Sequence, residues 1–470
     1  MHKLITLRRA LCYNLSMMTS LQKIIITIVA CAFFMEGLDA SIINTALPQI
    51  SLSLHTDPLH LKLALTAYLL TAGIVIPISG WMADRFGCQR VFAAALILFL
   101  FGSVLCGISR SVPELVLARV IQGAGGALSL PIGRLLFMRH FNKEEFVAAL
   151  ATTSTFGLLG PSLGPLIGGA LTTYFSWRAI FFVNIPIGLV GFYFVLRYIE
   201  NIKDPEIHAF DWRGFLILAS SLASLLLGLD TLIDPIVSPV VAVSCLGAGS
   251  IALWGYWRYA QRKSRVLIPL QLFDQTAFRL VIFGSIFARL AVSASPFLVP
   301  LLLQVGFHYT ALQAGLMTAW AALGMLLTKF FVKPLLQHFG YRKVLIVNSV
   351  FLSASTLILA TLSLHPPIVF MVCILFVNGV VASIQFSAMN SFGYTNIPVH
   401  LQSAGSSFMS SLQQVSAGFS IALAALILEC FLHSTNILGT YSPPSFRYTF
   451  MVVAVFPWMS IYFFRRLSKP

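Results

Sequence analysis

Long apolar runs recur along the whole chain and constrain its fold more than any other feature. Many of them reach the roughly 20 residues that an α-helix needs to cross the hydrocarbon core of a bilayer. Fourteen runs are predicted to span a membrane: 22–46, 63–82, 91–108, 113–137, 146–172, 178–197, 213–230, 236–258, 279–303, 311–333, 343–362, 367–391, 403–431 and 446–464. The predicted fold class is therefore an all-α integral membrane protein.

The composition excludes an ordinary soluble domain. Of the 470 residues, 58% are hydrophobic and only 10% are charged, and a soluble core cannot absorb that much apolar surface. A membrane β-barrel is excluded as well, because its strands alternate apolar and polar residues over about ten positions. Continuous runs of this length are typical of membrane-spanning helices, which satisfy their own backbone hydrogen bonds.

The runs 213–230 and 236–258 form the weakest pair of predicted spans. The first is short and ends at Asp230, and Asp234 and Pro235 follow in the turn. If these two runs do not cross the membrane, they fail together as a hairpin. The count would then fall to twelve, with the orientation of every other span unchanged.

The net charge of +15 gains its meaning from where the basic residues fall. With the N-terminus inside, only four Lys or Arg residues lie in outside loops, namely Lys62, Arg110, Arg178 and Arg447. This bias is the positive-inside pattern of membrane proteins, so both termini are predicted to be cytoplasmic and nucleic-acid binding is not expected. The seven Cys are scattered, which predicts neither a metal site nor a disulfide framework.

Two segments of the chain match each other weakly and indicate an internal repeat. Residues 80–90 read GWMADRFGCQR and residues 333–343 read KPLLQHFGYRK, so that Gly87 aligns with Gly340. Transporters are often assembled from repeats, with the substrate between them near the midplane. The predicted organisation is a six-helix bundle over 1–200, a linker with two extra spans over 201–274, and a second six-helix bundle over 275–470.

Residues 80–90 also resemble the signature cytoplasmic loop of the major facilitator superfamily, although Met82 replaces the usual leucine and residues 88 and 89 replace a basic pair. The matching residues are Gly80, Asp84, Arg85, Gly87 and Arg90. Gly80 is expected to let two helices approach and Gly87 to permit a tight turn. Asp84 is expected to pair with basic residues or to cap a helix. These residues are interpreted as a gating loop.

The run 146–172 contains the string GLLGPSLGPLIGG, which resembles the antiporter motif of the same superfamily. Its residues are Gly157, Gly160, Pro161, Gly164, Pro165, Gly168 and Gly169. Glycines four apart form a smooth groove for close helix packing, and prolines bend or loosen a helix. Ordinary small-residue packing is the alternative, but the full string favours an exporter.

The first run reads FFMEGLDASIINTALP over 33–48, which is similar to the LDxTIVNxALP motif of the fourteen-span drug:proton antiporter branch (EmrB/QacA-like), with Ser41 in place of threonine. The strings LARVIQGAGG over 117–126 and WRAIFFVNIPIG over 177–188 extend the likeness across the N-terminal half. The C-terminal half is matched only loosely, through 267–273 and 340–343.

The resemblance implies the major facilitator fold, with two pseudo-symmetric six-helix bundles and a two-helix insertion, and a transporter rather than an enzyme. It implies proton-coupled export (antiport) of small lipophilic, cationic compounds across a cell inner membrane by alternating access. The expected partners are a small-molecule substrate, protons and membrane lipid, with no cofactor, metal or nucleic acid, and the protein is expected to be monomeric. Export of a dedicated endogenous metabolite such as a siderophore is the alternative.

Three ionisable residues inside the spans are assigned to proton coupling. Glu36 and Asp39 lie three positions apart and share one helix face. Low dielectric and a nearby like charge both favour the protonated form of a carboxyl group, which suits a residue that takes up and releases protons. Asp39 is the first candidate for the proton carrier, with a purely structural hydrogen bond as the alternative. Arg119 is costly to bury unless it faces a cavity or a partner.

Two further charged residues lie in the second half. Glu429 is expected to reach the outer interface, with pairing to an intramembrane base as the alternative. Arg289 is expected to face the cavity or an acid of the opposite half, where a contact with Asp39 or Glu36 would form a switchable latch.

A mixed aromatic and polar cavity is predicted for lipophilic cations, which bind aromatic rings through packing and cation–π contact. The candidate lining residues are Phe33, Phe34, Tyr68, Phe283, Phe287, Arg289, Trp320, Asn378 and Gln385. Each residue alone is more often lipid-facing or core, so the prediction concerns the group. No phosphate-binding string GxxxxGK[ST] is present, so the chain itself is not expected to hydrolyse ATP.

Overall fold

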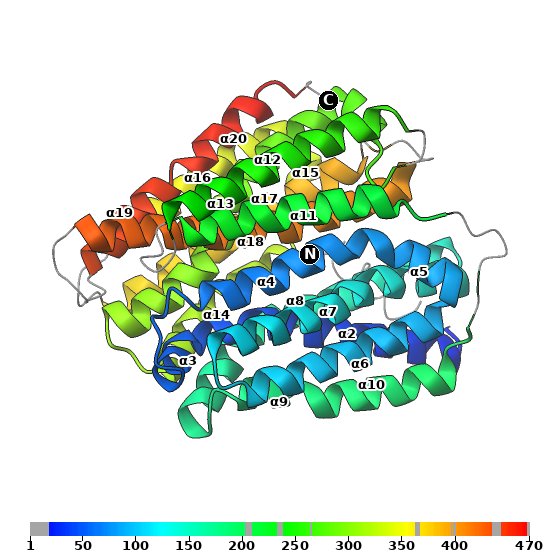
Figure 1. Ribbon diagram of the computed structural model, residues 1–470, viewed down its shortest axis with the longest axis horizontal. Coiled ribbons are helices and arrows are strands. Elements are labelled where there is room, and N and C mark those ends of the chain that lie inside the picture. Colours follow the sequence, from blue (N-terminus) through cyan, green and yellow to red (C-terminus); the bar gives the residue numbers. More distant parts are fainter. Residues whose placement is uncertain are drawn as a thin grey trace.

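The computed structural model describes residues 18–467 except 202, 204–208, 233–237, 264–265, 362–366, 396, 398–400 and 435–442. Asp234 and Pro235, placed by the sequence in a turn, therefore lie outside the described residues. Helices dominate the described chain, and they run side by side along the long axis of the molecule (Figure 1).

The first six long helices belong to the N-terminal half. They are α2 (Ser20–Ile42), α4 (Lys62–Val75), α6 (Cys88–Ile108), α7 (Val112–His140), α8 (Lys143–Tyr174) and α10 (Asn184–Tyr198). Short elements join or extend them: η1 (Ile43–Thr45), α3 (Leu47–Ser53), η2 (Ile76–Ile78), α5 (Ser79–Phe86) and α9 (Ala179–Phe182). Each of the six predicted runs of this half therefore coincides with a helix.

A hairpin of two helices follows, and then the C-terminal half. The hairpin is α11 (Trp212–Thr231) and α12 (Pro239–Gln261). The C-terminal half comprises η3 (Leu270–Asp274), α13 (Thr276–Leu301), η4 (Leu302–Gly306), α14 (Ala311–Thr328), α15 (Val332–Phe339), α16 (Tyr341–Ala360), α17 (Ile368–Thr395), α18 (Gln402–Ser434), α19 (Pro443–Val453) and α20 (Phe456–Phe464).

Thirteen helical segments of the described residues are long and apolar enough to cross a membrane. The weak pair 213–230 and 236–258 is among them, as α11 and α12. α8 lies beyond these thirteen, but its 32 residues extend about 48 Å and it packs along α2. The predicted run 446–464 forms two helices, α19 and α20, which are separated by a two-residue turn at 454–455. Together they make up one candidate span.

The predicted internal repeat is visible in the backbone. α5 and α15 are both eight-residue helices, and each ends on a glycine with positive φ, +92° at Gly87 and +74° at Gly340. This conformation is costly for residues with a side chain, which explains a glycine at both positions. Each glycine then begins the next long helix, α6 or α16. We call the end of the molecule that carries α5 the α5 end, and the opposite end, which carries η1 and α3, the η1 end (Figure 1).

The two halves touch along two seams, α4 against α18 and α8 against α14. At the η1 end one apolar cluster contains side chains of both halves, such as Ile43 and Phe297. Toward the α5 end the cores are separate, one built around Phe92 and Phe137 and another around Leu345 and Phe464. Among the described residues, the apolar cluster that the two halves share therefore lies at the η1 end.

Candidate functional site

The charged centre of the molecule is Asp39, which lies near the end of α2 and is completely buried. Arg119 of α7 is 1% exposed, and its Nη1 lies 2.6 Å from Asp39 Oδ2. Both residues are in apolar spans, where a lone charge would be very costly. The sequence required a partner for Arg119, and the structure supplies Asp39.

Two amides complete the ligands of the Asp39 carboxylate. Gln122 Nε2 donates to Oδ1 at 2.7 Å and Asn184 Nδ2 donates to the same oxygen at 2.8 Å. Gln122 lies one turn from Arg119 on α7 and also accepts from Arg119 Nη1 at 2.7 Å. Both carboxylate oxygens of Asp39 are thus engaged within the N-terminal half.

A second layer fixes these donors. Ser103 Oγ of α6 accepts from Gln122 Nε2 at 2.8 Å and from Asn184 Nδ2 at 3.4 Å. The Arg119 guanidinium lies over the ring of Tyr68, 4.1 Å from its centroid, in cation–π geometry. Its Nε donates to the carbonyl of Ala64 at 3.4 Å. Helices α2, α4, α6, α7 and α10 all contribute, so the cluster depends on the packing of the entire half.

Glu36 lies one turn before Asp39 and has no comparable set of partners. Its Oε2 is buried and, among the described residues, forms no hydrogen bond; the same holds for the hydroxyl of Tyr68. Gly126 of α7 lies between the two, since a methyl group there would be 2.9 Å from the Tyr68 hydroxyl and 3.7 Å from Glu36 Cγ. An ion-paired carboxylate and an unpartnered one therefore lie one turn apart.

The predicted gating loop lies at the α5 end, away from Asp39. Asp84 Oδ1 is 3.5 Å from Arg139 Nη2 of α7, which confirms that Asp84 pairs with a basic residue. Arg85 lies over the ring of Trp81, and the Arg90 backbone N–H donates to Asn201 Oδ1 at 3.3 Å. Gly80 differs from the prediction: a methyl group there would meet nothing within 4 Å, so no close helix approach depends on it.

The predicted glycine groove of α8 is confirmed. A Cβ on Gly160 would lie 2.6 Å from the backbone nitrogen of Leu38, and one on Gly168 would lie 2.5 Å from the carbonyl oxygen of Ile42. Gly164 is blocked in the same way by Ser41. α8 is therefore pressed against the part of α2 that carries Glu36 and Asp39.

The same helix touches the other half. A Cβ on Gly169 would lie 2.9 Å from the carbonyl carbon of Ala311 in α14, which belongs to the C-terminal half. Within the N-terminal half, a Cβ on Gly157 would lie 3.4 Å from Cβ of Phe33. Pro161 fits against Gly37 of α2, and the Pro165 carbonyl faces Gly315 of α14. α8 thus connects the first helix to the second half of the molecule.

The residues proposed to line one cavity occupy different environments. Phe33 is 6% exposed and packs near Gly133 and Gly157, and Tyr68 supports Arg119. Phe34 packs against the core at the η1 end. Phe283 and Phe287 both stack on Phe463, at 5.9 and 5.7 Å between centroids.

The remaining cavity candidates belong to the C-terminal half. Gln385 and Asn378 are both buried, and each forms a hydrogen bond. Gln385 donates to Ser349 at 3.1 Å, and Asn378 donates to Ser355 at 3.1 Å. Trp320 is 44% exposed. Arg289 Nη2 donates to Asn390 at 2.7 Å, whereas the basic partner of Asp39 is Arg119. In place of the contact with Asp39 that the sequence suggested, Arg289 binds Asn390 and lies over the ring of Phe386, both in the C-terminal half.

Glu429 also differs from its expected place at the outer interface. It is 8% exposed, and its Oε2 lies 3.5 Å from Lys62 Nζ. Lys62, expected in an outside loop, is the first residue of α4 and is 3% exposed. The structure therefore bears out the alternative that Glu429 pairs with a basic residue.

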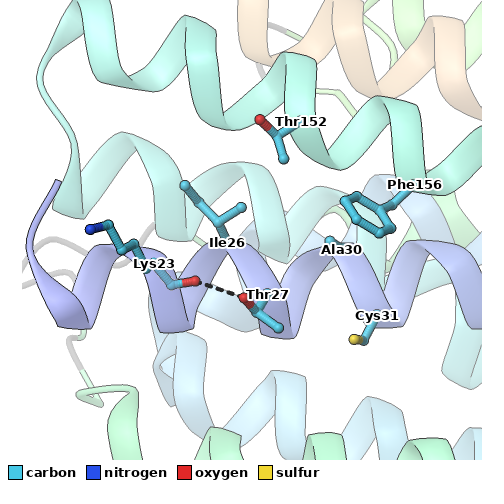
Figure 2. Close-up of a pocket in the computed structure, with 7 residues that line it drawn as sticks. All are labelled: Lys23, Ile26, Thr27, Ala30, Cys31, Thr152 and Phe156. Carbon is cyan, nitrogen blue, oxygen red and sulfur yellow. Dashed lines mark hydrogen bonds between the residues drawn. The ribbon is translucent and has the colours of Figure 1, made fainter. Parts of the chain in front are cut away.

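A pocket of about 260 Å³ lies between α2 and α8. Figure 2 shows Lys23, Thr27 and Cys31 along α2, opposite Thr152 and Phe156 on α8. The Thr27 hydroxyl donates to the carbonyl of Lys23 at 2.9 Å, so it satisfies itself locally. The lining is mostly apolar and contains none of the predicted site residues.

Sequence reasoning missed Gln122 and Asn184 as partners of Asp39, and Ser103 as the hydroxyl that accepts from both of these amides. Gln122 and Asn184 are amides inside otherwise apolar runs, and both lie in strings that carried the family resemblance. That combination is a usable signal, because a buried amide requires hydrogen-bond partners. Ser103 gives no such signal, since serine occurs throughout these helices and often bonds its own backbone.

These features define a class of protein: a polytopic membrane transporter built from two helical halves around buried charges. The family profile described as Major Facilitator Superfamily matches residues 29–420 and 281–470. The chain belongs to the major facilitator superfamily, a family of membrane transporters.

The similar proteins agree with this membership. A protein of Escherichia coli O6:H1, provisionally named multidrug resistance protein MdtD, is 37% identical over 444 residues, which cover 94% of each chain. The protein of the same name from Serratia proteamaculans is 38% identical over 413 residues, 86% of this chain and 85% of its own. The family likeness read from the sequence motifs is therefore confirmed.

Solved structures share the fold at low sequence identity. The xylose transporter XylE from E. coli superposes with a TM-score of 0.66 at 12% identity, over 96% of this chain and 98% of its own. An auto-inhibited peptide transporter of the POT family reaches 0.68 at 15% identity, over 96% and 98%. The major facilitator fold predicted from the sequence is confirmed.

Proposed function

We propose that the protein exports small lipophilic cations across the cell inner membrane in exchange for protons, by alternating access. The observation that carries the proposal is the buried carboxylate of Asp39, held by Arg119 and two amides inside a transporter fold. The name of the relatives, a provisional multidrug resistance protein, supports a drug-like cargo.

Proton coupling follows from how this cluster changes when Asp39 takes up a proton. A neutral Asp39 loses most of its attraction for Arg119, whose charge then needs another acceptor in an apolar span. Glu36, one turn away with an unpartnered oxygen, is available to accept it. Protonation of Asp39 would therefore move Arg119, and with it α7 relative to α2.

A movement of Arg119 would be transmitted to both seams between the halves. Tyr68 packs on the Arg119 guanidinium and belongs to α4, which forms one seam with α18. α8 lies against α2 through its glycines and forms the other seam with α14. A change at Asp39 is thus one helix away from each contact between the halves, which is the arrangement that coupled rocking requires.

Orientation supports the direction of transport. The bias of Lys and Arg supports an orientation with the α5 end in the cytoplasm and the η1 end outside. The shared core at the η1 end then corresponds to a state closed to the outside. Asp39 lies near the outer end of α2, close to the side from which protons enter during export.

Export is tested in inside-out vesicles that carry the protein and a pH-sensitive dye. After an acid-inside gradient is imposed, lipophilic cations are added to wild type, to Asp39→Asn and to the control Asp274→Asn, which changes an exposed acid outside the spans. Cation-dependent loss of the gradient in wild type and control, but not in Asp39→Asn, is expected.

Two outcomes would contradict the proposal. An undiminished response in Asp39→Asn would remove Asp39 from the coupling step. The absence of any response to cations in correctly inserted wild type would contradict the substrate class and favour export of a dedicated endogenous metabolite.

A further inference from the structure

The hairpin α11–α12 separates the two halves in the sequence and lies against both of them in the structure. α11 packs on α4 of the N-terminal half and on α18 of the C-terminal half. The hairpin therefore lies against the α4–α18 seam, one of the two seams between the halves.

A buried ion pair crosses this seam at the η1 end. Lys62 Nζ of α4 lies 3.5 Å from Glu429 Oε2 of α18, with both side chains at most 10% exposed. Breaking a buried pair leaves an uncompensated charge, so each partner depends strongly on the other. Lys62 and Glu429 can keep this contact only while α4 and α18 remain together.

Asp230 adds a second carboxylate from the hairpin. It lies in the last turn of α11, is 4% exposed, and accepts from the hydroxyl of Thr66 on α4 at 3.2 Å. Thr66 is one turn after Lys62 on the same helix, so Asp230 lies on the face of α4 that also carries Lys62. The ion pair of Lys62 is with Glu429 of the C-terminal half, and Asp230 of the hairpin is a second carboxylate near it.

The hairpin is rigid enough to hold Asp230 in place. The two helices approach closely, because a Cβ on Gly228 would lie 2.7 Å from the Leu246 side chain and one on Gly249 would lie 2.8 Å from Leu225. Ser221 Oγ donates to the carbonyl of Gly249 at 2.8 Å. The outward side of α12 is exposed, as at Val240 and Ile251, which suits contact with lipid.

We propose that the hairpin is a third component of the gate at the η1 end: Asp230 and Glu429 share Lys62, and α11 in the α4–α18 seam stabilises the closed state. We call the pair of Lys62 and Glu429, together with Asp230 beside it, the Lys62 latch. The role of this gate in transport rests on the alternating access proposed above, whereas the Lys62 latch itself affects only the equilibrium between the closed and open states. If α4 and α18 separate at this end, α11 can keep only one of its two partners.

The test measures that equilibrium directly. Spin labels are placed at Leu52 of α3 and Val369 of α17, which are 74% and 75% exposed and lie at the η1 end on opposite halves. The full chain, with its seven native cysteines replaced, is studied in lipid vesicles by electron–electron double resonance. The ratio of long to short label distances reports how often the η1 end opens.

Asp230→Asn and Glu429→Gln are each expected to raise the open fraction by about tenfold. Thr66→Val keeps every charge and removes the hydroxyl that donates to Asp230 and, within α4, to the carbonyl of Leu63; it is expected to give a smaller shift in the same direction. Asp274→Asn is the matched control, an exposed acid that is expected to leave the distances unchanged.

The shared lysine predicts a specific coupling. In a Lys62→Gln background, neither Asp230→Asn nor Glu429→Gln should raise the open fraction further, since the charge that both acids hold is absent. Equal shifts with and without Lys62, or no shift from Asp230→Asn in the native background, would overturn the latch. Because no substrate is used, these results stand independently of whether the protein exports cations.

Discussion

The polar interiors of the two halves differ in one respect that sequence repeats would not suggest. The N-terminal half contains the ionised pair Asp39 and Arg119 with its amide donors. The C-terminal half buries Arg289, which donates to Asn390, and separately contains a network of neutral groups: Asn348 donates to Gln385 at 2.9 Å, and Gln385 donates to Ser349 at 3.1 Å.

Both networks connect helices across a bundle, but only the charged one can change its state by gaining a proton. Ser349 reaches Ser460 of α20 at 3.1 Å, and Trp458 donates to Ser353 at 2.8 Å, so the neutral network ties α16, α17 and α20 together. A satisfied neutral network specifies and rigidifies a core. We therefore expect the N-terminal half to carry the coupling and the C-terminal half to act as a more rigid counterpart.

The largest expected effect comes from breaking the ion pair. Asp39→Asn should lower stability by about 3–5 kcal/mol, because it leaves the Arg119 charge buried without its acid. The double variant Asp39→Asn with Arg119→Gln should recover most of that loss while remaining inactive in proton-coupled transport. Thermal unfolding in detergent, combined with the vesicle assay, separates the two effects. Recovered transport in the double variant would contradict a coupling role for the pair.

Substitutions that disturb helix packing should destabilise both halves equally, whereas substitutions of charged residues should not. Gly164→Val in α8 and Gly379→Val in α17 each insert a side chain against a neighbouring helix, Ser41 of α2 or Ala321 of α14. Each is expected to destabilise by about 1–3 kcal/mol through overpacking. Gly80→Val is the matched control, because nothing lies within 4 Å of a Cβ there. A destabilised control would show that the variants do not report packing.

Removing a member of the neutral network should affect stability alone. Gln385→Leu leaves the Asn348 amide and the Ser349 hydroxyl short of a partner, at an expected cost of about 1–3 kcal/mol. The pH profile of transport should keep its wild-type midpoint. A displaced midpoint would show that the C-terminal half takes part in proton coupling, which would break the comparison.

The smallest effect is expected at the α5 end. The repeat places Gln337 of α15 where α5 has Asp84, so at this position the N-terminal half has an acid and the C-terminal half a neutral amide. The Asp84 side chain is 42% exposed, and partly exposed ion pairs contribute roughly 0–1 kcal/mol. Asp84→Gln should therefore change stability by less than about 1 kcal/mol, as measured by thermal unfolding. A larger loss would indicate a buried role that the repeat does not share.

Particular residues show how far the sequence reached. It identified Asp39, Glu36 and Arg119 as intramembrane charges, because ionisable residues stand out in apolar runs. It also aligned Gly87 with Gly340, because the need for positive φ is a local property of the backbone. It could not find Lys62 as the partner of Glu429, since 367 positions separate them and Lys62 reads as a loop residue.

The sequence by itself determined where the long helices lie and the family, since bilayer thickness and backbone hydrogen bonding act on each segment separately. Only the tertiary structure decided which charges meet, for a pairing depends on distances between helices that no local pattern records. Arg119 pairs with Asp39 of α2, Glu429 pairs with Lys62 of α4, and Gln385 is buried in the core of the second half. The same packing placed α11 in the seam between the halves, where a segment that reads as a linker contacts both of them.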